Sequence, residues 1–199
     1  MTAPVDGAGR RRMKPWKKHL LIFLATVAVT LAGGTTLLIR YAPPLVLNSA
    51  HKAISAGLGN GANTPDNTLY TVPYLASPET AHGNNWLLGG NQDGLYTVGW
   101  LDLSKGPELL TIPEMGSRYH NVEIVAPATG VVIANLKAPG TTFIAAAGHV
   151  TAAPHGMSVL DAPGKQVLVI GRTLVENSAD LPAALALAQQ IRVTPYAGQ

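Results

Sequence analysis

The stretch Gly89–Pro107 reads GGNQDGLYTVGWLDLSKGP and holds the clearest pattern in the chain. It alternates from Leu95 to Leu103, which predicts a β-strand, because successive side chains of a strand point to opposite faces. The face that is expected to pack on the core holds Leu95, Thr97, Gly99, Leu101 and Leu103. The other face holds Tyr96, Val98, Trp100 and Asp102. Asp93-Gly94 predicts a hairpin turn that joins this strand to an earlier one.

Short apolar runs between turn signals recur about every ten residues on both sides of this stretch, which predicts a mainly β domain over residues 67–195, an antiparallel sandwich or barrel. The other expected strands are Leu69–Tyr74, Asn85–Leu88, Glu108–Ile112, Tyr119–Ala126, Val131–Leu136, Thr141–Ala147, Met157–Leu160 and Gln166–Arg172. Near the C-terminus the apolar spacing becomes helical. Asp180 as N-cap and Pro182 in the first turn predict a helix over Leu181–Gln190, followed by extended chain. Its apolar face holds Leu181, Leu185, Ala188 and Ile191.

Residues 20–39 read LLIFLATVAVTLAGGTTLLI and predict one transmembrane helix, because twenty uncharged helical residues span a hydrocarbon core of about 30 Å. Six basic residues precede this run, so residues 1–19 are expected to be a cytoplasmic tail. A cleaved signal peptide is the alternative, but the apolar run exceeds the usual length of its hydrophobic region. We therefore expect a single-pass protein of the plasma (inner) membrane, with its domain outside or in the periplasm.

Residues 40–66 are expected to connect the span to the domain. Pro43-Pro44 predicts the end of the first helix, the apolar spacing in Leu45–Leu58 predicts a short juxtamembrane helix, and Gly57–Asp66 has the composition of a flexible linker. Within the span, small residues recur at every fourth position: Ala28, Ala32 and Thr36. Such a stripe is either a contact for a partner helix or ordinary transmembrane composition, and the second interpretation is the simpler one.

Composition and charge exclude several classes of function. The 199 residues include no Cys, which rules out thiol catalysis, disulfides and thiolate metal sites. The net charge of +3 arises in the N-terminal tail, whereas the chain from Arg40 onward has eight basic and ten acidic residues. A nucleic-acid-binding domain carries its positive charge on the folded part, so we expect no nucleic-acid partner.

Several motifs in this order resemble the domain of unknown function 1254 family. The family's turn and strand motif is matched at Asn91, Asp93, Leu95, Tyr96, Trp100, Leu101 and Asp102, its late strand at Ile170–Thr173, and its last helix at Asp180-Leu181. Gly94 stands where the family usually has Thr. The resemblance implies a β-sandwich-like domain, often exported or membrane-attached, with no established chemistry. Many relatives also carry a preceding helical segment and a following second β domain (domain of unknown function 1214), which this chain is expected to lack.

A polar group near the alternating strand is the best candidate for a ligand site: Asn91, Asp93, Tyr96, Trp100, Asp102 and, from the late strand, Arg172. Aromatic faces stack on sugars and carboxylates bind hydroxyls, so a small polar ligand would fit. In the competing interpretation, Asn91 and Asp93 stabilise their own turn and Trp100 anchors the core. Asp102, which lies next to Lys105 in the sequence, is then expected to form a carboxylate–arginine pair, with Arg118 as a candidate, that ties two strands together. Arg172 is expected to pair with Asp102 or Asp93, so that its replacement by Ala would destabilise the fold.

Other reaction chemistries have weaker signals. His82, His120, His149 and His155 lack the spacing of a metal site, so no metal and no cofactor are expected. No Gly-x-Ser-x-Gly elbow or phosphate-binding loop occurs, and the scattered carboxylates identify no catalytic pair. The first hypothesis is therefore an interaction module that works with a separate chain carrying the second β domain. The alternative is a binding protein or enzyme for a small polar ligand, such as a carbohydrate, with a pocket near Trp100 and Asp93.

Overall fold

The computed structural model describes residues 15–56, 64–75, 93–149 and 153–197. The contacts within the chain divide it into two compact units, Met1–Ala42 and Pro43–Gln199. The first consists of the N-terminal part of a long helix, α1 (Pro15–Ser55). The second holds the last turns of that helix, all the strands and a short helix, α2 (Leu181–Ala188).

Helix α1 continues through Pro43 and Pro44, so the prediction that it ends there is wrong. A proline inside a helix removes one hydrogen bond, but its fixed φ is helical and does not by itself end the helix. The turns after the prolines are stabilised by burial, because Ala50, Ala53 and Ile54 are all in the core. The expected juxtamembrane helix is therefore the end of α1. Most of the expected linker, residues 57–63, lies outside the described residues.

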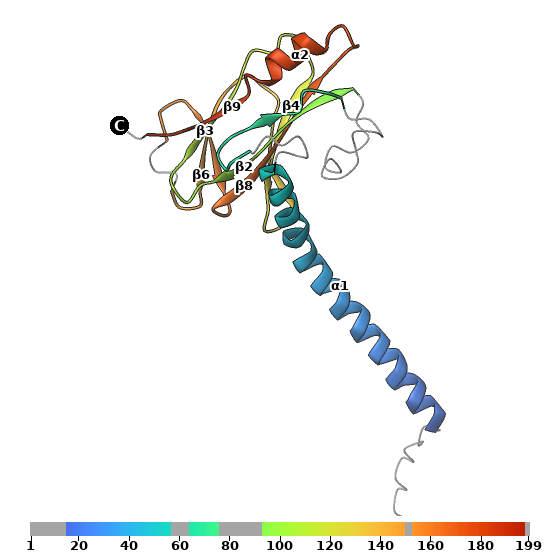
Figure 1. The fold of residues 1–199 in the computed structure, drawn as a ribbon. Helices are drawn as coiled ribbons and strands as arrows, with labels where there is room; N and C mark the ends of the chain where they lie inside the picture. The colour runs from blue at the N-terminus through green and yellow to red at the C-terminus, as the bar shows by residue number, and fades with distance from the viewer. Residues whose placement is uncertain (1–14, 57–63, 76–92, 150–152, 198–199) are drawn as a thin grey trace, which may run out of the picture. The chain divides into compact units, whose positions relative to one another are not determined.

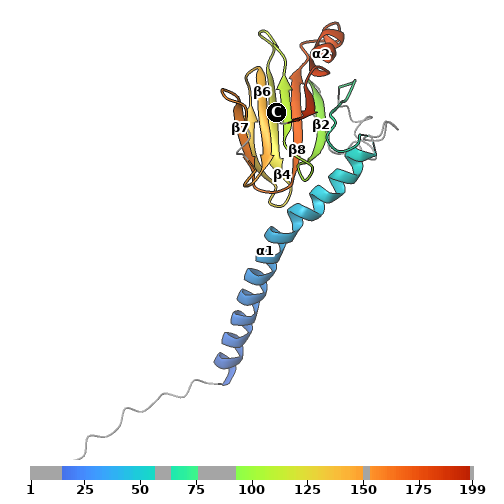
Figure 2. The same ribbon diagram turned by 90° about the vertical axis from the view of Figure 1, so that its left-hand side faces the viewer.

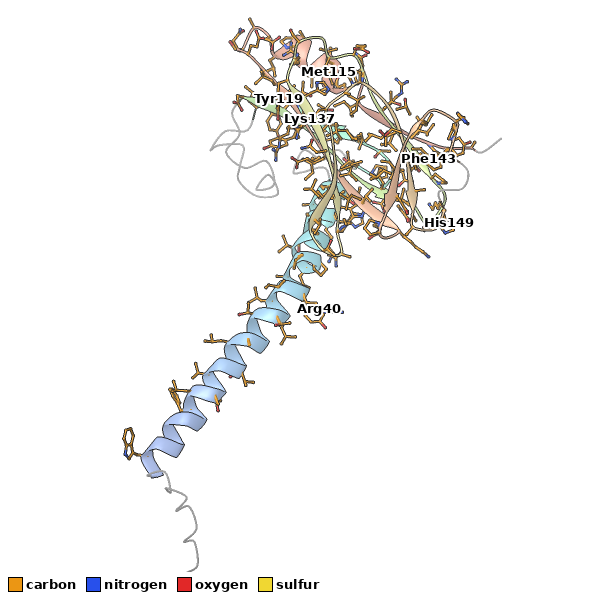
Figure 3. The ribbon with its side chains drawn as sticks, turned by 180° about the vertical axis from the view of Figure 1, so that it is seen from behind. Arg40, Met115, Tyr119, Lys137, Phe143 and His149 are labelled. Atoms are coloured by element: carbon orange, nitrogen blue, oxygen red, sulfur yellow. The ribbon has the colours of Figure 1, made fainter. Side chains whose placement is uncertain are left out.

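In the unit Met1–Ala42, helix α1 is long and apolar enough to cross a membrane. Its described large apolar side chains are exposed, including Val29 at 72% and Ile39 at 71%. Figure 3 draws the described side chains of this helix and labels Arg40. The Thr36 hydroxyl donates to the Ala32 carbonyl at 2.8 Å, which satisfies that polar group within the helix. Ala28, the third member of the small-residue stripe, lies outside the described side chains.

The strands form two sheets (Figures 1 and 2). The first has the order β1 (Tyr70–Thr71), β2 (Gly94–Asp102), β8 (Gln166–Leu174), β4 (His120–Ala126), β5 (Val131–Leu136). The second has the order β7 (Ser158–Ala162), β6 (Gly140–Ala146), β3 (Glu108–Ile112), β9 (Arg192–Pro195). Every pair is antiparallel except β6 and β7, which run parallel. The mainly β fold with a C-terminal helix is confirmed.

The main core lies between the two sheets. Its buried side chains come from β2, β4 and β8 on one side and from β3, β6 and β7 on the other, with Leu101, Ile124 and Val169 facing Leu110 and Ile144. All five are fully buried. This arrangement is a sandwich, which settles the choice between sandwich and barrel. The core face predicted for β2 is the inner face of its sheet, as Leu101 shows.

The outer face of β2 is also buried, which the alternation did not predict. Val98 and Trp100 pack with Leu168 of β8 and with Ile54 from the last turn of α1. The opposite, inner side of the strand needs a glycine at position 99, because a Cβ there would collide with the Thr68 carbonyl. Strand β2 is therefore enclosed on both faces along much of its length.

Most predicted elements are present with small shifts at their ends. Strands β3 and β5 have the predicted bounds, whereas β8 extends two residues further and β1 is much shorter than Leu69–Tyr74. The expected strand Asn85–Leu88, and with it the hairpin to β2, lies outside the described residues. Helix α2 lies across one end of the sheets, where Ala184 and Ala188 pack beside Leu95 (Figure 1). The extended chain expected after it is strand β9.

Candidate functional site

A row of polar side chains crosses the outer face of the first sheet, beyond the part that α1 covers. The strand register places Tyr96 of β2 opposite Arg172 of β8, and Arg172 opposite Asn121 of β4. Glu123 lies two positions along β4, on the same face. We define Tyr96, Arg172, Asn121 and Glu123 as the polar row. It unites two of the predicted site residues, which lie 76 positions apart in the sequence.

Arg172 is the most accessible charge of this row. Its side chain is 44% exposed, and its Nη1 lies 3.9 Å from Oε1 of Glu123, which is 21% exposed. The guanidinium also lies over the Tyr96 ring, 5.8 Å from the ring centroid, at the distance of a cation–π contact. An ion pair this long and exposed leaves most guanidinium donors available to a ligand. The predicted pairing of Arg172 with Asp102 is wrong, because Asp102 lies opposite Gln166 at the other end of β8.

Asn121 was not singled out from the sequence, and Glu123 was considered only among the scattered carboxylates. Asn121 is 3% exposed, and its amide donates to Glu123 Oε1 at 3.2 Å and to Asn135 Oδ1 at 3.5 Å. Its own Oδ1 is buried without a hydrogen-bond partner. The polar alternation Asn121-x-Glu123 within an otherwise apolar strand is a signal that could have indicated them. Asn121 positions the Glu123 carboxylate beside Arg172.

Trp100 has a structural role in the core. Its side chain is 1% exposed, and the His51 ring stacks on it at 4.4 Å between centroids with an interplanar angle of 18°. His51 Nε2 in turn donates to Asp66 Oδ1 at 2.7 Å. The interpretation of Trp100 as a core anchor is confirmed. His51, from the last turns of α1, occupies the ring face that the ligand hypothesis assigned to a sugar.

Asp102 ends β2 and stabilises the turn that follows. Its Oδ1 accepts a hydrogen bond from the Ser104 N–H at 2.9 Å. Hydrogen bonds from Ser104 hold the pKa of this carboxyl below its usual value, and Lys105 and Lys165 add to the effect. The predicted pairing with Arg118 is wrong, because Arg118 binds Asp180.

A pocket of about 490 Å³ lies at this Asp102 end of the domain. Three turns line it: residues 102–104, residues 126–129 and residues 163–166. Half of its lining residues are Ala, Pro or Gly, and Asp102 and Lys165 are its charged residues. From the sequence, a pocket was expected near Trp100 and Asp93. This one lies beyond the opposite end of β2 from Asp93.

Asp93 and Asn91 precede β2. The Asp93 carbonyl accepts a hydrogen bond from the Val175 N–H at 2.8 Å, which extends the pairing of β2 with β8 by one residue. Strand β2 begins at Gly94, one residue earlier than predicted. Asn91 lies outside the described residues. A ligand role for Asn91 and Asp93 stays a prediction.

Glu108, at the start of β3, is a buried carboxyl that the sequence did not single out. Its side chain is 3% exposed and faces the core between the sheets beside Leu110. The Asn67 amide donates to Oε1 at 2.5 Å, whereas Oε2 is buried without a hydrogen-bond partner. Burial raises the pKa of this carboxyl, and the hydrogen bond from Asn67 opposes the shift. Asn67 itself has a φ of 65°, a conformation that Asn tolerates better than most residues.

The arrangement supports binding chemistry more directly than catalysis. Among the described residues, no three His, Asp or Glu side chains converge as a metal site would require. His120 is buried, with its Nδ1 3.1 Å from the Arg118 carbonyl, so it takes part in the packing of β4. The polar row offers guanidinium donors, a carboxylate and an aromatic ring on one face. These groups suit recognition of a polar molecule.

The chain thus combines a β sandwich, which has the polar row on one outer face, with an apolar N-terminal helix. Comparison by sequence matches residues 67–195 to the family described as protein of unknown function (DUF1254), and the chain belongs to that family. No curated protein matches the sequence.

Two solved structures that match the chain differ in how well their folds agree with it. The VPA0106 protein from Vibrio parahaemolyticus matches with a TM-score of 0.60 and 19% identity, over 80% of this chain and 36% of that chain. An uncharacterised protein from Burkholderia cenocepacia matches with a TM-score of 0.37 and 16% identity, over 65% of this chain and 35% of that chain. This chain therefore spans only about a third of the length of the solved proteins. The Vibrio protein shares its fold.

Proposed function

We propose that this protein is a membrane-anchored interaction module whose exported β domain works with a second β domain on a separate chain. The observation that carries the proposal is the match to the Vibrio protein, in which this fold makes up 36% of a longer chain. A sandwich that forms one part of a larger protein has surfaces suited to a neighbouring domain. Docking to such a domain on another chain is an interaction, not a reaction, and it needs no catalytic constellation.

Helix α1 supports the anchoring part of this proposal. One helix in the described chain is long and apolar enough to span a membrane, and its basic N-terminal flank favours a cytoplasmic tail in the plasma membrane. The last turns of the same helix belong to the core of the domain, where Ile54 is 2% exposed. An anchor that ends inside the core attaches the domain to the membrane without relying on the residues 57–63.

The partner is tested with the full chain. We expect a tagged protein, extracted from its native membranes in mild detergent, to co-purify with a second chain at close to equal amounts. That chain should contain a β domain, and the complex should be larger than the monomer on sizing. A monomer that co-purifies with no such chain would contradict the proposal.

The topology is tested by cysteine labelling, which the absence of native Cys makes clean. Tyr119 is 58% exposed, so a Tyr119→Cys variant should react with a membrane-impermeant maleimide in intact cells. The matched variant Val5→Cys, in the basic tail, should react only after the cells are lysed. The reverse pattern would place the domain in the cytoplasm.

A second candidate function is the binding of a small polar ligand, such as a carbohydrate, at the polar row. The observation that favours it is the Arg172 guanidinium, whose carboxylate contact is as long as 3.9 Å. Glucuronate should raise the melting temperature of the full chain in detergent more than glucose does. The shift should disappear in Arg172→Gln and persist in Arg192→Gln, an exposed arginine of β9. Equal shifts in both variants, or none in the wild type, would contradict this candidate.

A further inference from the structure

Each sheet of the sandwich has two edge strands among the described residues: β1 and β5 in the first sheet, and β7 and β9 in the second. An open edge presents unpaired backbone groups, so proteins shorten it or place charges and prolines on it to prevent unwanted pairing. Strand β1 has only two residues. Strand β9 begins with Arg192 and ends with Pro195, and β7 carries an exposed Asp161. These three edges are protected against another strand.

Strand β5 lacks these protective residues. It reads VVIANL over Val131–Leu136, without a charge or a proline, and it is the longest of these four edges. Val131 is 56% exposed and Val132 is 48% exposed. One side of β5 pairs with β4, so along its other side alternate N–H and C=O groups point away from the sheet. The edge thus combines backbone groups that can pair with exposed apolar side chains.

A bulge divides this edge. Ile124 of β4 lies opposite Ala134, but Val125 lies opposite Val132, so Ile133 is an extra residue on β5. Ile133, Ala134 and Leu136 pack on the main core. A bulge interrupts pairing, so an added strand would form only a short ladder with β5. The exposed valines would have to supply the rest of the contact.

The charges near β5 indicate the chemistry of its partner. Lys137 follows the strand directly and is exposed. Figure 3 shows Lys137 near Tyr119, at the open end of the β4–β5 hairpin, where Tyr119 is also exposed. A matching surface would be an uncharged strand with apolar side chains and an acidic group near Lys137.

We propose that the β5 edge is the docking surface for the second β domain of the proposed function. An edge strand of that domain pairs with β5 and covers Val131 and Val132. This inference rests on the proposed function. The Vibrio protein supports an occupant from outside this fold, because the fold makes up only 36% of that longer chain and additional protein accompanies it. A partner strand satisfies the open backbone groups, which a partner helix would leave unpaired.

The test compares two exposed valines on edge strands. Val132→Lys, at 48% exposure on β5, should reduce recovery of the partner chain about tenfold, because it places a charge in the apolar contact. Val159→Lys, at 42% exposure on β7, should leave recovery unchanged. Both variants should melt close to the wild type. If Val132→Lys unfolds, Val131→Lys serves as the second variant, with the same expected loss.

Cross-linking identifies the occupant directly. A photo-crosslinking residue at position 132, in the full chain in its native membranes, should link to a β-strand of the separate chain, whereas one at position 159 should not. Cross-links only between two copies of this chain would overturn the inference, as would equal capture from both positions. If the wild type binds the partner, and both Val132→Lys and Val131→Lys also retain it, docking at the β5 edge is contradicted while the proposed function stands. If the wild type binds no partner, both fail.

Discussion

Arg172 belongs to strand β8 and Arg118 donates to the carbonyl at the end of that strand, yet their guanidinium groups have different roles. Arg118 donates to both carboxylate oxygens of Asp180, at 2.5 and 2.6 Å, and to the Leu174 carbonyl at 2.7 Å. The Arg118 and Asp180 side chains are 15% and 16% exposed. Arg172 is 44% exposed and lies 3.9 Å from Glu123. Arg118 is enclosed with three hydrogen bonds, whereas Arg172 is open, with one long carboxylate contact and the Tyr96 ring beside it.

The difference separates a structural charge from an available one. Two parallel hydrogen bonds to a carboxylate are strong and directional, so Arg118 ties the start of α2 to the end of β8. Asp180 precedes α2 as its N-cap residue, but its side chain makes no capping hydrogen bond and binds Arg118 instead. A long, exposed pair contributes little to stability, so the Arg172 donors are free to serve recognition.

The largest effect is expected from breaking the enclosed pair. Arg118→Ala removes both guanidinium hydrogen bonds from the Asp180 carboxylate, which keeps the one from the Glu176 N–H, and the one to the Leu174 carbonyl. It should lower the melting temperature by roughly 5–10 °C. Arg118→Lys keeps the charge but cannot form both bonds, so its loss should be intermediate. Differential scanning calorimetry of the full chain in detergent measures both. An unchanged melting temperature in Arg118→Ala would show that the pair has no structural role.

The Arg118–Asp180 pair also predicts that the stability of the fold depends on pH in the acid range. Hydrogen bonds from Arg118 lower the pKa of Asp180 to about 2, from an ordinary value of 3.8. A lowered pKa in the folded state means that the stabilisation is present above the ordinary pKa and is lost as the pH falls from about 4 to about 2. The difference in urea midpoint between wild type and Asp180→Asn should therefore shrink over this range. A difference that stays constant down to pH 2 would contradict the assignment.

Glu108 extends the comparison to a carboxyl whose partner is an amide. Burial raises its pKa above the ordinary 4.5, in the opposite direction to Asp180. Its contribution is fully present below pH 4.5 and is lost as the pH rises through the raised pKa. Glu108→Gln keeps the acceptor for Asn67 and cannot ionise, so at pH 7 it should melt roughly 2–5 °C above the wild type.

A measurement at lower pH is the control for the Glu108→Gln prediction. At pH 4 the wild-type carboxyl is largely protonated, so the melting temperatures of the wild type and Glu108→Gln should converge. Glu108→Ala removes the acceptor for Asn67 and should destabilise the domain at both pH values. A Glu108→Gln variant that is less stable at pH 7 would show that the ionised carboxylate is the favoured form in the fold.

The sequence predicts the fold well because strands and turns have local signals. The alternation in Leu95–Leu103 and the turns around β3 and β5 located those strands within a residue. The continuation of α1 through Pro43 and Pro44 was not predictable in the same way. It depends on packing of the last turn against Trp100 and Leu168, which is a tertiary contact. Local rules for proline gave the wrong helix end for that reason.

The candidate site was predicted only in part, because it depends on strand register. Tyr96 and Arg172 meet because β2 and β8 pair antiparallel, and the same register separates Arg172 from Asp102. The sequence provides the residue types but not which strands are neighbours. Asn121 and Glu123 entered the site for the same reason, since β4 lies on the other side of β8. For Trp100, the interpretation as a core anchor was correct and the interpretation as a ligand-binding ring was not needed.

The smallest effect on stability is expected at the open arginine. From sequence, Arg172 was expected to hold two strands together, so that its loss would destabilise the fold. The long contact with Glu123 now predicts that Arg172→Gln changes the melting temperature by less than about 3 °C. The control is Glu123→Gln, which removes the other member of the pair while Asn121 can still hydrogen-bond to the new amide oxygen.

The pair of variants decides what the open arginine does. If Arg172→Gln and Glu123→Gln both melt like the wild type and only Arg172→Gln loses the glucuronate shift, Arg172 acts in recognition. If Arg172→Gln falls as far as Arg118→Ala, the distinction between an enclosed and an open arginine is wrong. Because the guanidinium is 44% exposed, solvent replaces its contacts at little cost, so the first outcome is the expected one.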